Sequence, residues 1–134
     1  RTLSRQRLIA VASPSYLEAH GTPAGAKDLK HHRCLTGFAR GELPMTSWTV
    51  RGKSIQVNTT FSSNSLRLLR DAAVDGVGIA LLPEFFTDEC LARGTLVQVL
   101  PKVLEHARVL AVIYPEREMM QPQTRAFIDA VVAW

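Results

Sequence analysis

Cysteine is scarce in this sequence of 134 residues, which contains only Cys34 and Cys90. Two cysteines are too few for the disulfide framework that stabilises many small secreted domains, so that class of protein is excluded. Both stand among apolar neighbours, and we therefore expect two small, reduced residues of the hydrophobic core.

Long hydrophobic runs are also missing. No apolar stretch approaches the roughly 18 residues that a membrane-spanning helix needs, so we expect no membrane partner. The first residues, RTLSRQRLIAVASPSY, combine basic side chains with an apolar patch. This patch is too short for a signal peptide, and Pro14 interrupts it. Nothing in the sequence marks export, and a cytoplasmic location is favoured.

A concentrated basic stripe is absent as well. Sixteen Lys and Arg residues against twelve Asp and Glu residues give a net charge of +4, which raises nucleic acids or anionic ligands as partners. The basic residues are scattered along the chain, whereas a DNA-binding surface usually concentrates them around a recognition helix. We expect most of this charge to serve solvation.

Catalytic and cofactor-binding motifs are the fourth absence. The sequence has no G-x-S-x-G elbow and no G-x-x-x-x-G-K-[ST] phosphate loop, and Gly76-x-Gly78 lacks the third glycine of a dinucleotide-binding loop. The segment His31-His32-x-Cys34 offers metal-ligand types but no second pair at zinc spacing, so we expect a loop with two exposed histidines. The sequence therefore predicts no enzyme, no metal site and no cofactor.

What the sequence does contain is an alternation of strands and helices. The apolar run RLIAVAS at 7–13 predicts a buried strand, and Pro14 and Gly21 predict the start and end of the next helix. The alternation continues along the chain, which predicts an α/β fold with a mostly parallel sheet flanked by helices. Further strands are expected at 33–38, 77–83, 95–100 and 106–115, a hairpin at 47–51 and 53–59, a helical turn at 24–32, and helices at 66–75, 84–93 and 121–134.

Apolar residues at helical spacing predict which helix faces are buried. Gly76 is expected in the left-handed conformation that ends the helix before it, with Val77 folding back on the last turn. The expected buried stripes are Leu66, Leu69 and Ala73 in this helix, and Phe127, Val131 and Trp134 in the last one.

A cluster of small polar residues follows a predicted strand at 54–61 and precedes the next helix. It consists of Ser62, Ser63, Asn64 and Ser65. A helix cap needs only one or two such residues, whereas a helix N-terminus flanked by hydroxyl and amide groups can also hold a carboxylate or another anion. Ligands in open α/β sheets bind beyond the carboxyl ends of strands. The residues alone leave both interpretations open, a cap or a ligand site.

Taken in order, the motifs resemble LysR-type transcriptional regulators. The segments LIAVASPSYLEAHGTP and AKDLKHHRCL resemble the start of the second lobe of their effector-binding region. The resemblance continues through W-x-V-x-G, SSNSLRLLRDAAVDGVGIALLPEFF and LARGTLVQVLP to LAVIYPERE and TRAFIDAVVAW. Each motif alone is weak, but the series covers essentially the whole chain at the spacing of the family.

The resemblance implies a fold like that of type 2 periplasmic binding proteins. Two α/β lobes, joined by two crossover strands, hold a small effector in the cleft between them. Residues 1–105 are expected to form lobe two, and residues 106–134 the strand and helix that return to lobe one. The family also carries an N-terminal winged helix-turn-helix and a linker helix, and neither resembles any part of this sequence. We therefore expect an N-terminally truncated chain from which the DNA-binding domain is absent.

The same resemblance implies a site and partners. In the family, the start of the helix after the polar cluster forms one wall of the effector pocket, and the loop after the CL strand faces the same cleft. The expected partners are a small effector such as a carboxylate, further copies of the chain in a homodimer or higher homo-oligomer, and DNA through the absent domain. The implied effector contacts are Thr36, Gly37, Phe38, Ser62, Ser63, Asn64 and Ser65.

Effector sensing is the leading interpretation, and three alternatives stand beside it. A solute-binding protein of a transport system shares the fold but requires export. An enzyme on the same scaffold would turn over a candidate substrate. A structural dimerisation piece with a vestigial cleft would tolerate replacement of Asn64 and Ser65 without loss of a ligand response.

Overall fold

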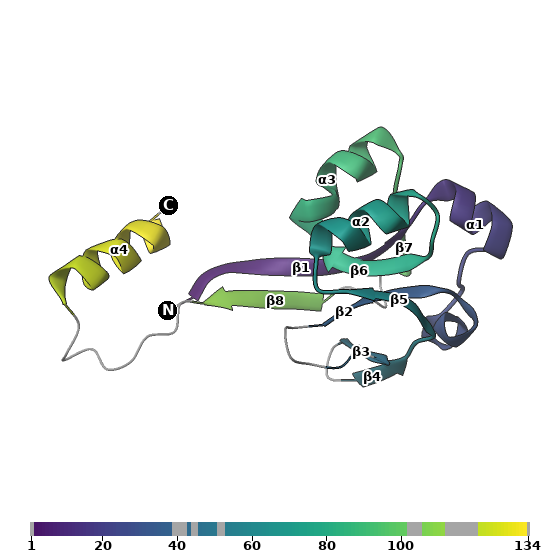
Figure 1. The fold of residues 1–134 in the computed structure, drawn as a ribbon, viewed down its shortest axis with the longest axis horizontal. Coiled ribbons are helices and arrows are strands. Elements are labelled where there is room, and N and C mark those ends of the chain that lie inside the picture. The colour runs from purple at the N-terminus through teal and green to yellow at the C-terminus, as the bar shows by residue number, and fades with distance from the viewer. Residues whose placement is uncertain are drawn as a thin grey trace. The chain divides into compact units, whose positions relative to one another are not determined.

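The computed structural model describes residues 2–38, 43, 46–50, 53–101, 106–111 and 121–133. The chain divides into two compact units. The larger unit is Arg7–His106, and the smaller combines Arg1–Gln6 with Ala107–Trp134. Strand β1 (Thr2–Ala12) contributes residues to both. Figure 1 shows the order of the elements along the chain.

Helix α1 (Pro14–His20) begins and ends where the sequence predicts. At its start, Ser13 Oγ accepts a hydrogen bond from the N–H of Tyr16 at 3.1 Å, which satisfies one of the free amides of the first turn. At its end, Gly21 adopts φ of +82°, a conformation that glycine tolerates best. The 3-10 helix η1 (Ala26–His31) follows and confirms the predicted helical turn.

The main sheet has the strand order β5-β2-β6-β1-β7, and β8 also pairs with β1. Strand β2 runs parallel to β5 and to β6, whereas β1 runs antiparallel to β6 and to β7. The predicted α/β class with parallel strands is confirmed, and the antiparallel pairing of β1 is the departure within it. The strands are β2 (Cys34–Gly37), β5 (Thr59–Ser63), β6 (Ile79–Pro83), β7 (Val97–Val99) and β8 (His106–Ala111).

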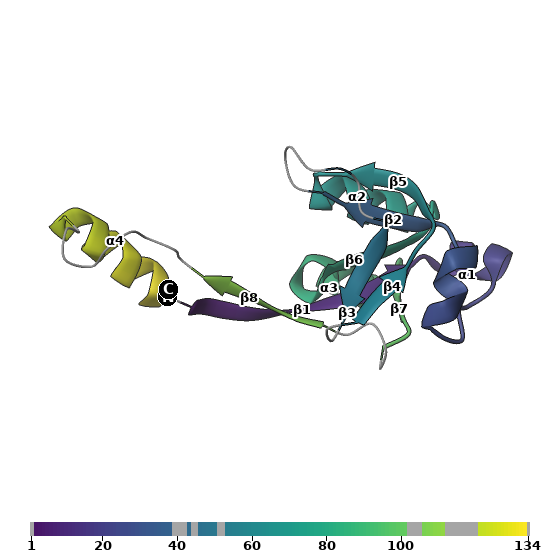
Figure 2. The ribbon, with the colours of Figure 1, turned by 90° about the horizontal axis from the view of Figure 1, so that it is seen from below.

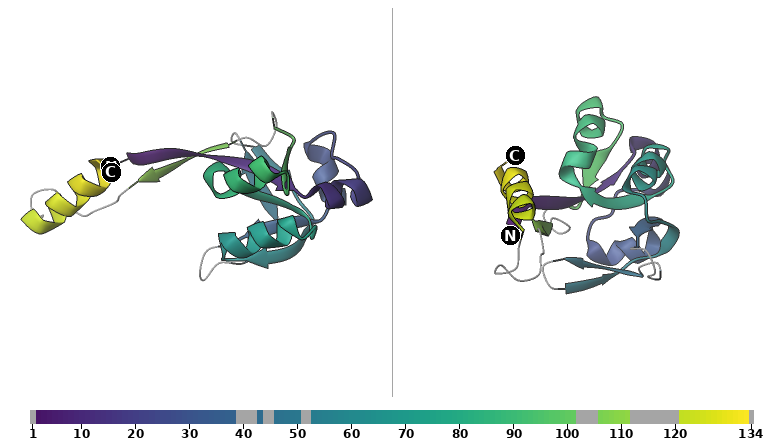
Figure 3. Two further views of the ribbon diagram at one scale, coloured as in Figure 1. Left: turned by 90° about the horizontal axis from the view of Figure 1, so that it is seen from above. Right: turned by 60° about the vertical axis from the view of Figure 1, so that its left-hand side comes forward.

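Helices α2 (Leu66–Val74) and α3 (Glu84–Arg93) lie side by side (Figure 3). The Arg70 guanidinium of α2 lies 4.6 Å from the centroid of the Phe86 ring of α3, which is a cation–π distance. Helix α3 ends at Gly94, as predicted, with φ of +74°. The contact between Arg70 and Phe86 ties the two helices together.

Alternate residues of β1 pack into two hydrophobic clusters on the two faces of the sheet. Ile9 belongs to the cluster that contains Leu69 of α2. Ala10 belongs to the cluster that contains Tyr16 of α1 and Trp48. Because successive side chains of a strand point to opposite faces, α2 and α3 cover one face, while α1, η1 and a small β-ribbon cover the other (Figure 2).

Both cysteines are free thiols. Cys34 is buried in the cluster that contains Tyr16, as expected for a small core residue. Cys90 of α3 is half-buried and packs against the cluster that contains Leu69. Both cysteines were expected in the core, but only Cys34 is fully buried. Cys90 is partly exposed because it lies on a helix that has one face toward solvent.

The β-ribbon replaces part of a predicted long strand. Strands β3 (Ser47–Val50) and β4 (Lys53–Gln56) form an antiparallel pair outside the main sheet. The prediction of one continuous strand at 54–61 is wrong, because the chain passes from the ribbon to the main sheet at Asn58. The carbonyl of Asn58 accepts a hydrogen bond from the N–H of Cys34 at 2.9 Å. The alternation of polar and apolar residues runs unchanged through this point, so it gave no signal of the break.

Helix α2 ends as predicted, but its buried face starts later than expected. Leu69 is fully buried, whereas Leu66, the first residue of the helix, is 44% exposed, so the predicted stripe is wrong at Leu66. After the helix, Gly76 adopts φ of +81°, and the N–H of Val77 donates to the carbonyl of Ala72 at 3.0 Å. This bond folds the chain back over the last turn, as predicted.

The smaller unit contains β8, paired with β1, and helix α4 (Pro122–Ala133). Ile128 is buried, whereas Phe127 is 68% exposed, so the predicted stripe is wrong at Phe127. Phe127 and Ile128 are adjacent in the helix, so a narrow contact face can bury the side chain of only one of them. Trp134 lies outside the described residues. No helix in the described ranges has the length and apolar character to cross a membrane.

Candidate functional site

Two segments assigned to the site by resemblance are neighbours in the sheet. The parallel register of β2 and β5 places Thr36 opposite Ser62 and Gly37 opposite Ser63. Phe38 follows β2 directly and is half-buried. Because parallel strands run in the same direction, the carboxyl ends of β2 and β5 reach the same sheet edge, where open α/β sheets bind ligands.

Hydroxyl groups join the two strand ends. Thr36 is fully buried, and its Oγ1 lies 3.0 Å from Ser62 Oγ. Thr36 Oγ1 also donates to Thr59 Oγ1 at 3.4 Å, which is long for a hydroxyl bond and therefore weak. These bonds occupy Thr36, so it positions the strand ends. Thr59 was not predicted as part of the site; its only signal was its place three residues before the polar cluster, at the start of β5, the strand that pairs with β2.

Part of the polar cluster serves as the cap of α2. Ser65 is the N-cap residue, and its Oγ accepts the N–H of Leu68 at 3.3 Å. Ser63 Oγ accepts the N–H of Ser65 at 3.0 Å, which stabilises the turn between strand and helix. Ser62 and Ser63 are the last residues of β5 rather than the approach to the helix. The cap interpretation therefore accounts for Ser63 and Ser65.

Asn64 and the first amides of α2 are the donors that can face a ligand. Asn64 is exposed, and its side chain has no hydrogen-bond partner in the described part of the chain. The N–H groups of Leu66 and Arg67 stand in the first turn, where helix geometry provides no acceptor. The first turn also has no acidic residue to balance the positive end of the helix dipole. This arrangement can donate hydrogen bonds to a small anion.

The buried groups of the segment His31-His32-x-Cys34 bond within the protein. His31 is exposed as predicted, but the predicted exposure of His32 is wrong: the ring is buried, and its Nδ1 lies 2.8 Å from Tyr16 Oη. The thiol of Cys34 donates to the carbonyl of Leu29 at 3.5 Å, and burial raises its pKa to about 11. Among the described residues, no group of three potential ligands could hold a metal ion.

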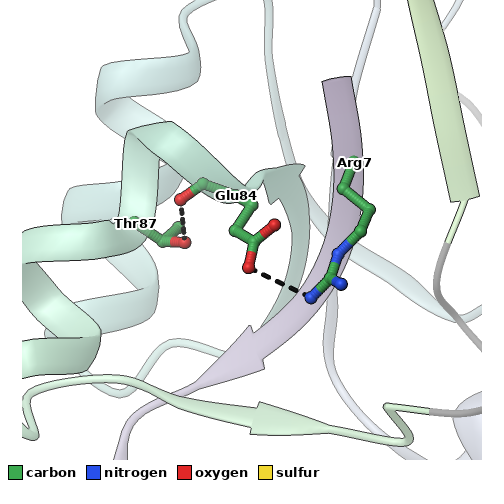
Figure 4. Close-up of polar contacts among 3 residues, drawn as sticks. All are labelled: Arg7, Glu84 and Thr87. Atoms are coloured by element: carbon green, nitrogen blue, oxygen red, sulfur yellow. Dashed lines mark hydrogen bonds and ion pairs between the residues drawn. The ribbon is translucent and has the colours of Figure 1, made fainter. Parts of the chain in front are cut away.

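The acidic residues at the start of α3 serve the fold. Glu84 is the first residue of α3, where a negative charge suits the helix dipole. Its Oε1 accepts a hydrogen bond from the Arg7 guanidinium at 3.0 Å, and its carbonyl accepts one from Thr87 Oγ1 at 2.9 Å (Figure 4). Both charged side chains of this ion pair are more than 40% exposed, so its contribution to stability is small.

Comparison with known proteins identifies relatives across the whole chain. The family model described as LysR substrate binding domain matches residues 1–134. The HTH-type transcriptional regulator CrgA of Neisseria meningitidis serogroup C (strain 8013) is 31% identical over 136 residues, covering 98% of this chain and 45% of CrgA. The HTH-type transcriptional activator TtdR of Escherichia coli K12 is 31% identical, covering 98% of this chain and 43% of TtdR. The chain thus spans less than half the length of these relatives.

Solved structures agree with the sequence relatives. The full-length structure of the Vibrio cholerae virulence activator AphB matches 99% of this chain and 46% of its own, with a TM-score of 0.79 and 31% identity. The regulatory domain of CrgA from Neisseria meningitidis matches 99% of this chain and 66% of its own, with a TM-score of 0.72 and 31% identity. The chain therefore belongs to the family of LysR substrate-binding domains, the effector-binding domains of LysR-type transcriptional regulators.

Proposed function

We propose that this chain senses a small anionic metabolite and thereby controls DNA binding by the winged helix-turn-helix of a complete regulator. One observation carries the proposal: the register of β2 and β5 brings Thr36 and Ser62, which are distant in the sequence, to one sheet edge beside the start of α2. Residues assigned by resemblance to a single effector pocket thus share a single edge.

A carboxylate is the ligand class that the donors at this edge favour. The Asn64 amide and the N–H groups of Leu66 and Arg67 can all donate to carboxylate oxygens. An anion at a helix N-terminus gains about 0.3–2 kcal/mol from the dipole, depending on its burial. Hydrogen bonds to a charged oxygen are also stronger than those to a neutral one. The buried hydroxyl of Thr36 holds the strand ends in place behind these donors.

Effector binding acts through a conformational equilibrium in this proposal. In this proposal residues 1–105 act as lobe two and residues 106–134 as the returning part of lobe one. The compact unit Arg7–His106 supports this division, although Arg1–Gln6 groups with the smaller unit. An effector shifts the balance between lobe or subunit arrangements only by its difference in affinity for them. The relatives are transcriptional regulators, which favours sensing over transport or turnover and a cytoplasmic place of action.

Ligand binding is expected to raise the melting temperature in a way that depends on Asn64. A ligand that binds only the folded state stabilises it by about 2.7 kcal/mol at a hundredfold excess over Kd. A thermal-shift screen of small carboxylates, aromatic acids and amino acids is the measurement. Asn64→Ala removes a side chain without a partner in the described part of the chain, so the ligand-free melting temperature should stay unchanged while the ligand shift falls.

Asn58→Ala is the matched control for this screen. Asn58 is also an exposed asparagine, but it precedes β5 and lies at the opposite end of that strand from Asn64. A compound that stabilises the parent and Asn58→Ala but not Asn64→Ala supports the site. Equal shifts in all three proteins would contradict it. Ser65 is less suitable for this test, because its replacement also removes the cap of α2.

We further propose that the chain forms a homodimer or a higher homo-oligomer. Leu66 and Leu68 of α2 are 44% and 49% exposed, which is apolar surface that association can cover. Light scattering across micromolar concentrations is expected to give a mass above the 14.8 kDa of one chain. A strictly monomeric mass over that range would contradict this proposal.

A further inference from the structure

A buried tyrosine and histidine meet where strand β2 begins. Tyr16 comes from α1, and His32 lies between η1 and β2; both are more than nine-tenths buried. Tyr16 Oη lies 2.8 Å from His32 Nδ1 and accepts the backbone N–H of Arg33 at 3.0 Å. One hydroxyl group therefore connects α1 to two successive residues at the start of β2.

The hydrogen-bond partners of Tyr16 assign a protonation state to His32. Tyr16 Oη accepts from Arg33, and in the described part of the chain His32 Nδ1 is the acceptor within reach of the buried Tyr16 O–H, so we assign Nδ1 as the acceptor. The imidazole is therefore neutral, with its proton on Nε2. If His32 takes up a second proton, Nδ1 becomes a donor and the Tyr16 hydroxyl loses its acceptor. Protonation thus reverses the direction of this bond, leaves the buried Tyr16 O–H without an acceptor and buries a charge at the same time.

We propose that Tyr16 and His32 form a proton-operated latch that holds the start of β2 against α1 and is released when His32 is protonated. The consequence reaches further along the chain because Arg33 is also bonded to β6: its carbonyl accepts the N–H of Ile79 at 2.8 Å. Releasing the latch loosens the point at which β2 is held by both α1 and β6. This inference goes beyond effector sensing and does not depend on it.

Burial lowers the pKa of His32 below its ordinary value of 6.5. The Asp28 carboxylate opposes this shift, and His20 and His31 add to it. The His20 ring is also stacked on Tyr16, with ring centroids 4.6 Å apart. The titratable and charged groups around His32 are Tyr16 and His20 of α1, Asp28 and His31 of η1, Arg33, and Cys34 of β2.

The direction of the pH dependence follows from the lowered pKa. The unfolded chain protonates His32 near pH 6.5, whereas the folded chain resists protonation until a lower pH. Between these two values the unfolded state binds more protons than the folded state, and stability falls as the pH falls. The latch therefore contributes its full stabilisation of the folded state above pH 6.5. This stabilisation decreases below pH 6.5 and stops decreasing once His32 of the folded chain is protonated.

His32→Asn tests the latch, because the asparagine Oδ1 can take the place of Nδ1 as an acceptor that does not titrate at these pH values. Thermal unfolding is measured from pH 8 to pH 5 for the parent, for His32→Asn and for the control His31→Asn, whose histidine is exposed. Over this range the melting temperatures of the parent and the control are expected to fall by about 3 °C more than that of His32→Asn. An equal loss in all three proteins would overturn the latch.

A titration of the parent by NMR provides a test that needs no variant. The His32 ring and the backbone amide of Arg33 are expected to titrate with one midpoint, below the ordinary histidine value of 6.5. Amide exchange at the start of β2 is expected to accelerate over the same pH interval. An Arg33 amide that does not respond to the His32 titration would refute the coupling through Tyr16.

Discussion

Replacement of Leu69 by alanine is expected to destabilise the fold by about 3 kcal/mol, because it removes a large buried side chain and leaves a cavity. Leu69 of α2 is fully buried in the cluster that contains Ile9 and Leu35. These neighbours belong to two different strands, β1 and β2, so they cannot both move to fill the space. Urea unfolding gives the free energy of unfolding and, through the m-value, shows whether the transition stays cooperative.

Leu68→Ala is the matched control for this prediction. It is the same substitution one residue earlier in the same helix, but Leu68 is 49% exposed. Because Leu68 also belongs to the surface proposed to associate, unfolding is measured at a concentration where the chain is monomeric, and the effect is then expected to stay within about 0.5 kcal/mol, as for most surface positions. If the two variants lost equal stability, burial of Leu69 in the core would not be the cause of its loss, since alanine favours the helix at both positions. The comparison also concerns the proposed site, because Leu69 anchors the helix whose first-turn amides are proposed to face the ligand.

Gly78→Ala is expected to cost about 3 kcal/mol, at the upper end of what overpacking usually costs. A Cβ at this position would lie 2.4 Å from the carbonyl oxygen of Arg33, which is a backbone atom and cannot rotate away. The same oxygen accepts the N–H of Ile79, so a shift that relieves the clash would also disturb the pairing of β2 with β6. Thermal or urea unfolding measures this loss.

Gly25→Ala is the corresponding control. No atom lies within 4 Å of the position that its Cβ would take, and its φ of −156° is extended backbone that any residue adopts. Its replacement is expected to change stability by less than about 0.5 kcal/mol. A comparable loss at both glycines would show that the close approach to Arg33 is not the reason that Gly78 is needed.

Local signals were sufficient to predict most of the elements. Pro14 and Gly21 mark the two ends of α1, and Gly94 marks the end of α3, because each acts on the backbone conformation of its own segment. The apolar run in β1 likewise predicted burial, since a strand covered on both faces has no polar side. These signals depend on neighbours in the chain and need no knowledge of the fold.

The errors fall where distant segments meet. The break at Asn58 depends on which strand accepts pairing with Cys34, and nothing in the alternating sequence encodes that partner. The burial of His32 depends on Tyr16, a residue from another helix. Leu66 was predicted to be buried from its spacing alone, but the contact face of α2 begins beyond it.

The two segments assigned to the candidate site could be named from the sequence and the resemblance, but the hydrogen bonds that their residues make could not be predicted. The sequence placed a polar cluster before a helix, and resemblance added the segment after β2. By itself the sequence determined the order of the elements, their caps and the family, because these depend on local backbone preferences and on motifs in series. Only the tertiary structure decided that Thr36 bonds Ser62 and that Asn64 faces outward, because both outcomes depend on which donors and acceptors the fold brings within reach.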